Sequence, residues 1–291
     1  MTDVTCPACE GSDVRPWAVK AGHAIRQCHG CGALSSVPNA TASTELYARY
    51  YDASTFETPV PVAASLTRLV VAAERFRRLG RWLDVGYGEG GLLGAAERKG
   101  WACHGVEVSP QALEYGRRRG WTVTAEVDDT RLGDAAFDVV SMIELVEHVA
   151  EPRRLFEAAG RWLRAGGLLY LTTPNAGSLN RRLLAEAWSV IAPPEHVTLW
   201  TTRGLDQALR DFGFAIRRVR TEGHNPADLL NSMRRRTGRA TGDVDRNAMG
   251  RALIDTLNRS RSRRLVKAAV NESLSAFRLG DTLKIWAERV K

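Results

Sequence analysis

Four cysteines near the start of the chain have the spacing of a metal site. Cys6 and Cys9 form one C-x2-C pair, and Cys28 and Cys31 form a second pair after an 18-residue spacer. Four thiolates in this arrangement close a tetrahedral shell around Zn²⁺, and a closed shell leaves no open position for catalysis. The start of the chain shows no secretory signal, so we expect a reducing, cytoplasmic environment in which zinc is favoured over two disulfides. The spacing therefore predicts a structural zinc ribbon.

A glycine-rich stretch, LDVGYGEGGLL at residues 83–93, predicts a cofactor loop that fits either of two ligands. Gly86, Gly88 and Gly91 have the G-x-G-x-x-G spacing of a nicotinamide-dinucleotide turn, and Glu107 lies about 20 residues on, where an acid would hold a ribose. A pyrophosphate requires backbone N–H groups and a helix N-terminus with no carboxylate close by. The glycines alone leave the choice of cofactor open.

Two carboxylates in the same stretch favour one of the two ligands. Asp84 precedes the glycines, and Glu89 lies inside the turn. S-adenosylmethionine carries an ammonium and a sulfonium but no phosphate, so opposite charges attract it to an acidic loop that repels a dinucleotide. Glu107 would accept hydrogen bonds from the ribose hydroxyls of either cofactor. We therefore predict S-adenosylmethionine as the cofactor.

The segments that must position these residues alternate between strand and helix patterns. From residue 81 to residue 174, short apolar runs alternate with amphipathic helical runs, separated by glycine-containing turns. This alternation predicts an α/β fold with a doubly wound, mostly parallel sheet. Ligands of such sheets bind at the carboxyl ends of the strands, where residues 84–90, 107–109 and 141–148 fall.

The sequence divides into five parts. They are a zinc ribbon (1–40), a linker with N-terminal helices (41–80), a cofactor-binding core (81–225) with a substrate-covering segment (176–204), a basic helical insertion (226–280) and a final core strand (281–291). Within the covering segment we expect a helix and then a loop at PPEHVTLWT, and a second helix, TRGLDQALRDFGF, follows the loop.

Five motifs in order resemble those of class I S-adenosylmethionine-dependent methyltransferases. They are Asp84-x-Gly86-x-Gly88-x-Gly90, Glu107, FDVVSMIELVEHVAEP (137–152), LRAGGLLYLTTPN (163–175) and PPEHVTLWT (193–201). The similarity covers roughly residues 80–222. It is greatest to the small-molecule branch related to the ubiquinone-pathway O-methyltransferases, in versions with an N-terminal zinc ribbon. The resemblance implies a Rossmann-like sheet whose last strand is antiparallel.

The resemblance also implies which residues contact the cofactor. Asp84, Gly86 and Gly88 would line the methionine end, Glu107 would hold the ribose, Glu126, Val127 and Asp128 would flank the adenine, and Ile143 and Glu144 would lie beside the cofactor. Tyr87 and Val108 complete the implied set. Tyr87 occupies a position that is often small or polar in the family, where its side chain would either stack near the methionine or pack in the interior.

Two histidines are placed to remove a proton from a methyl acceptor. His148 follows the fourth strand of the core, and His196 lies in the loop after the substrate-covering helix. An alcohol acceptor has to lose its proton during in-line methyl transfer, and imidazole is the side chain most used for such a step. Each histidine also has a structural interpretation, His148 at the start of a helix and His196 as a pin for its loop. Our hypothesis is that one of them is the general base.

The net charge of +8 is concentrated in the last quarter of the chain, because residues 217–291 hold 18 Lys and Arg against 8 Asp and Glu. Such a basic block favours an anionic partner, although a solvated helical face explains it equally well. We expect a small-molecule acceptor that is anionic or linked to a carrier or a nucleotide, with the block as a lid or a homodimer element. No apolar run approaches the ~18 residues of a membrane span.

Two other functions fit parts of the sequence. An RNA methyltransferase would suit a zinc ribbon followed by a basic segment, but the N-P-P-[YF] signature of base-amine enzymes is replaced here by IELVEH. A non-catalytic assembly protein would use the ribbon and the insertion for pairing, and the intact glycine loop with Glu107 argues against it. The preferred prediction is O-methylation of a hydroxyl on a biosynthetic small molecule.

Overall fold

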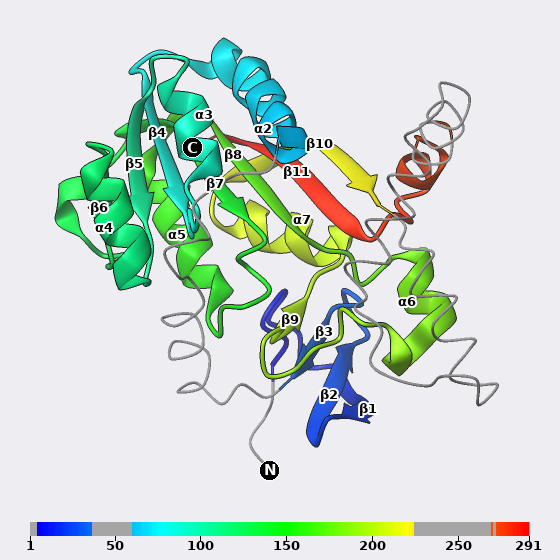
Figure 1. Cartoon of the computed structure of the whole chain (residues 1–291). Helices are drawn as coiled ribbons and strands as arrows, with labels where there is room; N and C mark the ends of the chain where they lie inside the picture. Colours follow the sequence, from blue (N-terminus) through cyan, green and yellow to red (C-terminus); the bar gives the residue numbers. More distant parts are fainter. Residues whose placement is uncertain (1–4, 37–59, 224–268, 270–271, 291) are drawn as a thin grey trace.

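The computed structural model describes residues 5–36, 60–223, 269 and 272–290, which form one large sheet and one small sheet. Residues 41–59 of the predicted linker (41–80) and most of the predicted basic insertion lie outside these residues. Figure 1 places the small sheet on the side where the parallel strands of the large sheet end. Among the described residues, no helix combines the length and apolar character needed to cross a membrane.

The large sheet has the strand order β10-β11-β8-β7-β4-β5-β6. Its strands are β4 (Arg81–Val85), β5 (Ala102–Val106), β6 (Thr122–Thr124), β7 (Phe137–Ile143), β8 (Leu163–Pro174), β10 (Phe214–Glu222) and β11 (Thr282–Arg289). The strands from β4 to β8 are parallel, and β11 runs antiparallel to β8 and β10 on its two sides. This arrangement confirms the predicted doubly wound α/β fold with an antiparallel last strand.

Helices cover both faces of the large sheet (Figure 1). One face packs against α2 (Val60–Ala73), α3 (Gly91–Glu97) and α4 (Pro110–Arg118), and the other packs against α5 (Pro152–Trp162) and α7 (Thr202–Asp211). Helix α6 (Leu179–Leu184) packs against the small sheet. Short 3-10 turns lie at Glu74–Phe76, Thr130–Leu132 and Ala185–Ala187, and residues 272–276 are helical.

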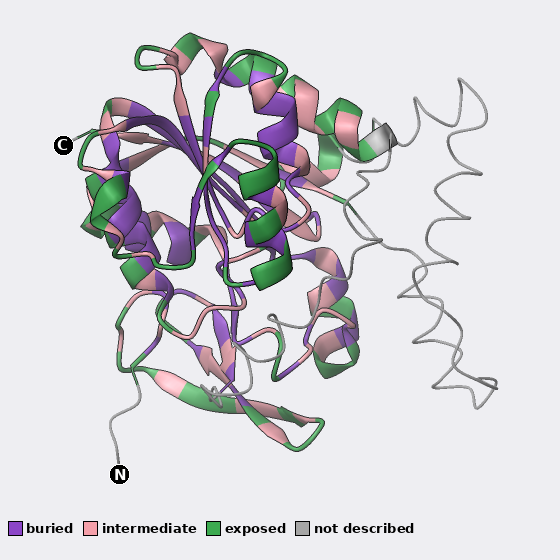
Figure 2. Cartoon of the chain, turned by 60° about the vertical axis from the view of Figure 1, so that its left-hand side comes forward, coloured by how far each residue is buried: buried purple, intermediate pink, exposed green. Residues whose placement is uncertain are grey.

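Strand β7 shows why this sequence forms a sheet that is covered on both sides. Val139 packs in the cluster beneath α2, α3 and α4, whereas Val140 packs in the cluster beneath α5 and α7, and both are fully buried. Because successive side chains of a strand point to opposite faces, a strand buried on both faces requires a largely apolar run, and the two buried polar residues of β7, Asp138 and Ser141, are hydrogen-bonded. Figure 2 shows the buried strands between the helical layers.

The small sheet joins the predicted ribbon to the core. It has the order β1-β2-β3-β9, with β1 (Val14–Lys20), β2 (His23–Cys28), β3 (Leu34–Ser36) and β9 (Thr198–Leu199), all antiparallel. Strand β9 belongs to the covering segment, in the stretch that we expected to be a loop. It forms because β3 presents an unpaired edge whose N–H and C=O groups the covering segment satisfies. The ribbon and the core therefore share one sheet.

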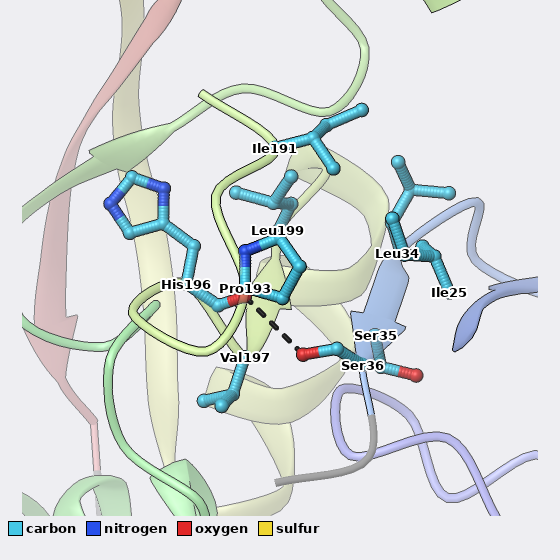
Figure 3. Close-up of a pocket in the computed structure, with 9 residues that line it drawn as sticks. All are labelled: Ile25, Leu34, Ser35, Ser36, Ile191, Pro193, His196, Val197 and Leu199. Atoms are coloured by element: carbon cyan, nitrogen blue, oxygen red, sulfur yellow. Dashed lines mark hydrogen bonds between the residues drawn. The ribbon is translucent and has the colours of Figure 1, made fainter. Parts of the chain in front are cut away.

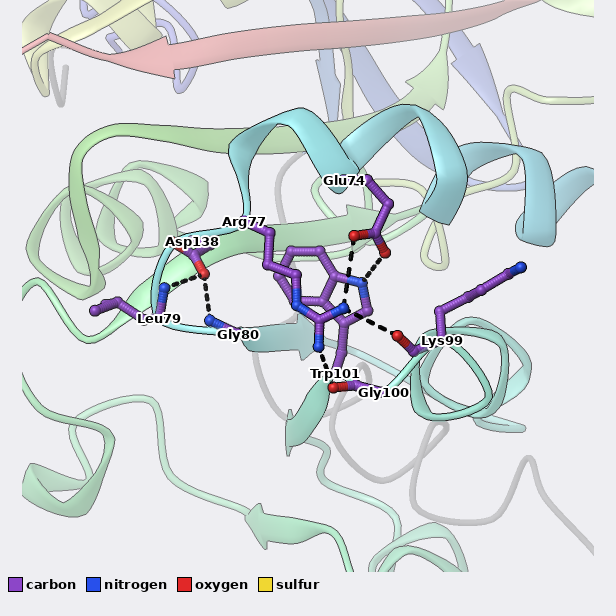
Figure 4. Close-up of polar contacts among 8 residues, drawn as sticks. All are labelled: Glu74, Arg77, Leu79, Gly80, Lys99, Gly100, Trp101 and Asp138. Atoms are coloured by element: carbon purple, nitrogen blue, oxygen red, sulfur yellow. Dashed lines mark hydrogen bonds and ion pairs between the residues drawn. The ribbon is translucent and has the colours of Figure 1, made fainter.

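A network of polar contacts fixes the start of β4 (Figure 4). The carboxylate of Asp138 on β7 accepts hydrogen bonds from the backbone N–H groups of Leu79 at 2.8 Å and Gly80 at 2.7 Å. Arg164 on β8 donates to the other oxygen of Asp138 at 2.7 Å. Asp84 lies near the other end of this five-residue strand, where it pairs with Gly105 of β5 and Ser141 of β7.

Candidate functional site

The glycine loop turns sharply between β4 and α3. Gly86 and Gly90 have φ angles of 70° and 71°, in the left-handed region that residues with a Cβ rarely adopt. A Cβ on Gly86 would also lie 2.9 Å from the side chain of Leu145, and one on Gly90 would lie 2.7 Å from the ring of Trp121. The glycines therefore let the loop pass close to neighbouring side chains, and they place its backbone at the carboxyl end of β4.

Asp84 is buried at this end of β4. Its side chain is 3% exposed, and its carboxylate accepts a hydrogen bond from the hydroxyl of Ser141 on β7. Burial raises the pKa of Asp84 to about 7, against the Ser141 hydrogen bond, and Glu107 adds a smaller repulsion. A buried carboxylate without a cation close by is costly to ionise, so a positively charged ligand would supply the missing partner.

Glu107 binds the loop backbone from the next strand. One carboxylate oxygen accepts the N–H of Gly88 at 2.9 Å, and the other accepts those of Val108 at 2.7 Å and Ser109 at 3.0 Å. A carboxylate offers about four acceptor sites, so the oxygen that faces Gly88 retains a lone pair for a further donor. The side chain thus fixes the glycine loop and has the capacity for a ligand hydroxyl.

Tyr87 points away from the loop into the interior. Its hydroxyl donates to the carbonyl of Ala112 at 2.7 Å, and its ring meets Trp121 edge-on at 6.1 Å. A Cβ on Gly105 of β5 would lie 2.4 Å from the tyrosine ring, so the ring fills the space that this glycine leaves. Of the two alternatives for Tyr87, the side chain adopts the packing role, which leaves its backbone as the part that a cofactor could reach.

The residues that the resemblance assigns to the adenine follow the neighbouring strand β6. Glu126 and Asp128 are exposed and Val127 is half-buried. Val108, which follows β5, is also exposed. Because parallel strands end at one edge of a sheet, all four residues lie at the same edge as the glycine loop.

At the end of β7 the chain turns abruptly. Ile143 ends the strand, and Glu144 follows with a φ of 48°, a conformation that non-glycine residues rarely adopt. The N–H of Glu144 donates to the carbonyl of Thr172 at 3.0 Å. The side chain of Glu144 is accessible to solvent, yet surrounding protein raises the pKa of its carboxyl. This turn directs the chain that follows toward the covering segment.

The structure brings the two predicted histidines together. The rings of His148 and His196 lie 4.7 Å apart, although the residues are far apart in sequence. The Nδ1 atom of His148 lies 2.9 Å from the carbonyl of Glu195, and that of His196 lies 2.6 Å from the carbonyl of Val190. A carbonyl only accepts, so Nδ1 is the donor in both rings and Nε2 holds the lone pair of the neutral form.

Glu147 completes a cluster with the two histidines. It is 1% exposed, and one of its oxygens accepts a hydrogen bond from Thr173 at 2.8 Å. The other oxygen lies 3.7 Å from Nε2 of His148 and has no hydrogen-bond partner among the described residues. Burial, and then repulsion from Glu144, raise the pKa of Glu147 to about 8.

The histidines of this cluster are neutral at physiological pH. Burial lowers the pKa of His148 to about 4, against the hydrogen bond to Glu195, and burial also lowers the pKa of His196. One ligand atom from each histidine and one from Glu147 lie within 4.8 Å of one another. Two neutral imidazoles beside a carboxyl can accept and pass on a proton, and the same three atoms could also hold a divalent cation.

The four cysteines also converge. Their Sγ atoms all lie within 4.8 Å of one another, with 3.7 Å between Cys6 and Cys31 and 3.6 Å between Cys9 and Cys28. None of the four forms a disulfide. Zn–S bonds of about 2.3 Å in a tetrahedron separate the sulfur atoms by about 3.8 Å, so the observed spacing fits Zn²⁺.

Sequence reasoning missed two residues of the site. Ser141 orients Asp84 and also accepts the indole N–H of Trp82 at 2.9 Å. Glu147 was overlooked although it stands directly before His148 in the sequence. Their contacts join different strands, so no local pattern indicates them. A polar residue in the middle of the apolar run FDVVSMI was the available sign for Ser141.

Comparisons with known proteins show the family to which the chain belongs. A family model described as a methyltransferase domain matches residues 59–219. A ubiquinone biosynthesis O-methyltransferase from Idiomarina loihiensis is 32% identical over 136 residues, which are 44% of this chain and 54% of that relative. One from Parvibaculum lavamentivorans is 28% identical over 166 residues, or 50% of this chain and 63% of the relative. The chain thus matches between about half and two thirds of the length of these curated relatives.

Two solved structures share the fold. A putative sarcosine dimethylglycine methyltransferase from Galdieria sulphuraria superposes with a TM-score of 0.52 at 14% identity, covering 86% of this chain and 98% of the other. A geranyl diphosphate C-methyltransferase from Streptomyces coelicolor superposes with a TM-score of 0.51 at 18% identity, covering 78% of this chain and 77% of the other. At such low sequence identities, the similarity to these two structures shows a shared fold and nothing about the reaction.

Proposed function

The chain belongs to the methyltransferase domain family, whose model covers more than half of its length, and on that premise we propose that it is an S-adenosylmethionine-dependent O-methyltransferase of a small molecule. The cofactor, when bound, supplies an electrophilic methyl group on a sulfonium. The residues of the chain then have three tasks, which are to hold the cofactor, to align the acceptor and to remove the acceptor's proton.

The cofactor is held by the carboxyl ends of β4 and β5. Asp84 attracts the cationic methionine end, since its buried carboxyl has no cation among the residues described around it. Glu107 accepts from the ribose, and Gly86 and Gly88 let the loop backbone approach. Glu126, Val127 and Asp128 flank the adenine, while Val108, Ile143 and Glu144 lie beside the cofactor, as the resemblance implies.

The acceptor's proton goes to the histidine cluster. One observation carries this part of the proposal, which is that Nδ1 of both His148 and His196 is committed to a backbone carbonyl. The neutral form of each ring therefore has its lone pair on Nε2, and the lowered pKa of His148 keeps it unprotonated at neutral pH while making it a weaker base. A hydroxyl that binds here would lose its proton to Nε2 as its oxygen attacks the methyl group.

The cysteine ribbon has a structural role. Cys6, Cys9, Cys28 and Cys31 would hold one Zn²⁺ with no open ligand position, so the ion would stabilise the fold and take no part in methyl transfer. The arrangement of the four sulfur atoms supports this assignment.

A methyl-transfer assay tests the proposal. Purified chain is incubated with S-adenosylmethionine that carries an isotopically labelled methyl group and with a panel of catechols, phenols and aliphatic alcohols, and the products are analysed by NMR. We expect the label on an oxygen atom of at least one acceptor. Label on nitrogen or carbon, or no transfer to any hydroxyl of the panel, would contradict the proposal.

A further inference from the structure

The end of the large sheet opposite the cofactor loop is strongly basic. Three segments meet there, residues 74–81, 97–101 and 114–121, and they lead into the neighbouring strands β4, β5 and β6. Together they hold nine Lys and Arg against three Glu, whereas residues 1–216 as a whole hold 23 Lys and Arg against 25 Asp and Glu. The positive charge is therefore concentrated on these three segments, which we call the basic patch.

Contacts between neighbouring segments hold the basic patch together, and Figure 4 shows those of the first two segments. The guanidinium of Arg77 donates to the backbone carbonyl of Lys99 at 3.0 Å. The second and third segments are joined by Glu97, which accepts the indole N–H of Trp121 at 3.2 Å. The charges of the three segments thus lie on one continuous surface.

The three glutamates of the basic patch already have partners within it. Their ion pairs are Glu74–Arg77 at 3.5 Å, Glu97–Arg119, and Glu114–Arg118 at 3.2 Å. The other basic residues form no ion pair with any described residue, and they are Arg75, Arg78, Arg81, Arg98, Lys99 and Arg117. Arg81 is half-buried and the other five are exposed. Six cations of the patch therefore stand without a carboxylate among the described residues.

Helix ends account for only a part of this charge. Helices α3 and α4 and the 3-10 turn that follows α2 all end in the basic patch, and the carbonyl end of a helix attracts cations. Each such end is equivalent to roughly −0.5 elementary charge, so the three together offset about 1.5 positive charges. The six unpaired cations are about four times that number, so the patch retains charge for an anionic partner.

The chemistry of the basic patch fits a chain of phosphates. Eight of its nine cations are arginines, whose planar guanidinium binds two phosphate oxygens at once. Trp101 and Trp121 are buried, so neither ring is free to stack on an unpaired base, as single-strand binding requires. Leu79 is the one large apolar side chain of the three segments that is exposed, whereas a protein interface needs a larger apolar centre. A nucleic-acid duplex satisfies all three conditions.

The basic patch is separate from the cofactor site. Strand β4 has five residues, so the two ends of this strand lie about 16 Å apart at about 3.3 Å per residue. The pocket in Figure 3 lies beyond the other end of the sheet, between the small sheet and the covering segment, and has room for only about one water molecule. A partner bound to the patch would therefore lie on an open surface and leave the cofactor site accessible.

We propose that the basic patch is a docking surface for the phosphate backbone of a double-stranded nucleic acid. Contacts to phosphates carry no sequence information, so binding is independent of sequence. The inference does not depend on the proposed function, because the duplex is a partner and not the methyl acceptor.

Salt-dependent binding tests the proposal. Binding of duplexes of about 20 base pairs, one of RNA and one of DNA, to the full chain is measured by fluorescence anisotropy between about 50 and 200 mM salt. The test variant combines Arg75→Gln, Arg78→Gln, Lys99→Gln and Arg117→Gln. Each lost phosphate contact reduces the slope of log K against log salt by about 0.9, so we expect a slope about three to four smaller and an affinity at least about tenfold weaker for both duplexes.

A control variant separates the basic patch from the other basic part of the sequence. It combines Arg234→Gln, Arg235→Gln, Arg236→Gln and Arg239→Gln, which remove the same charge from the C-terminal quarter of the chain. We expect its slope to stay within about one of the wild type. A milder variant, Lys99→Gln with Arg117→Gln, should reduce the slope by about two, and melting temperatures show that each variant folds.

Three results would overturn the proposal. The first is that neither duplex binds the wild type. The second is that the fourfold and the milder patch variants both keep the wild-type slope. The third is that poly-glutamate of matched length binds the wild type as tightly as the duplexes do, which would indicate an acidic protein as the partner.

Discussion

At the scale of residues, the chemistry of the site depends on which side chains are buried without a charge of opposite sign. The sequence predicts the acids and the histidines, since Asp84, Glu107, His148 and His196 all stand at strand ends or in the covering segment. It does not predict their protonation. The raised pKa of Asp84 follows from its burial, and its orientation follows from Ser141, 57 residues away in the sequence. Such shifts come from tertiary contacts and have no local signature.

The histidine pair gives a prediction for acceptor turnover. We replace His148 and His196 by Gln, one at a time, and measure kcat with a catechol that the enzyme methylates. The replacement of the histidine that is the general base should lower kcat by about 10²–10⁴. Because burial holds the pKa of His148 at about 4, the base form is present above that pH, and the acid limb of kcat/KM in the wild type should lie well below pH 6.5. Rates from pH 4 to 8 in both variants and the wild type, at S-adenosylmethionine concentrations that saturate the enzyme at every pH, measure this.

The affinity for S-adenosylmethionine is the control for these variants, and it should remain within about twofold of the wild type. Turnover within about threefold of wild type in both variants would show that neither histidine is the general base. An acid limb near pH 6.5 would show that the reacting histidine is not held in its neutral form by burial.

At the scale of elements, the predicted strands and helices of the core are present because their apolar periodicity is long and regular. The parallel sheet with β11 antiparallel matches the prediction. Strand β9 was not predicted, because it has only two residues and forms by pairing with β3, more than 160 residues earlier. A two-residue strand leaves no periodic pattern, and its existence depends on a partner that a single sequence does not indicate.

The contacts at the start of β4 predict a specific loss of stability. Asp138→Asn should lower the free energy of unfolding by on the order of 3 kcal/mol at pH 7, because it breaks a buried ion pair with Arg164. Asp134→Asn is the matched control, since Asp134 is exposed and lies 3.7 Å from Arg161. Urea unfolding of both variants measures the difference, and equal losses would contradict the account.

The same carboxylate predicts a dependence on pH. Burial opposes ionisation of Asp138, but Arg164 and the backbone N–H groups outweigh it and lower the pKa below its ordinary value. A group whose pKa is lower in the folded state stabilises the protein fully above the ordinary carboxyl pKa, and this stabilisation is lost as the pH falls through the lowered value. The gap in stability between wild type and Asp138→Asn should therefore shrink in acid.

At the scale of the whole molecule, the cysteine ribbon and the core share one buried cluster of side chains. Cys6, Cys28 and Cys31 belong to the same buried cluster as Trp200 and the residues beneath α5 and α7. The sequence shows the ribbon clearly through its cysteine spacing, but it gives no indication of where the ribbon docks. The docking position depends on the surfaces that the folded elements present to each other, and these surfaces form only when the whole chain folds.

This integration predicts how zinc affects stability. The chain should contain about one Zn²⁺ per molecule, and removal of the metal should lower the melting temperature of the whole protein in a single transition. The reason is that binding of a structural metal contributes directly to the free energy of folding of the part that it holds. Elemental analysis and calorimetry measure both quantities. A separate early transition for the ribbon, with an unchanged melting temperature of the core, would contradict the prediction of a single transition.

The central claim is that a buried carboxylate selects a cationic cofactor, and titration calorimetry at two pH values tests it most directly. On the proposal that ionised Asp84 binds the cofactor, its pKa of about 7 means that affinity should fall roughly tenfold between pH 7.0 and pH 5.5. Asp84→Asn should bind weakly at both pH values, and NAD should not bind the wild type. Affinity of the wild type that does not change with pH, or binding of NAD in place of S-adenosylmethionine, would contradict the account.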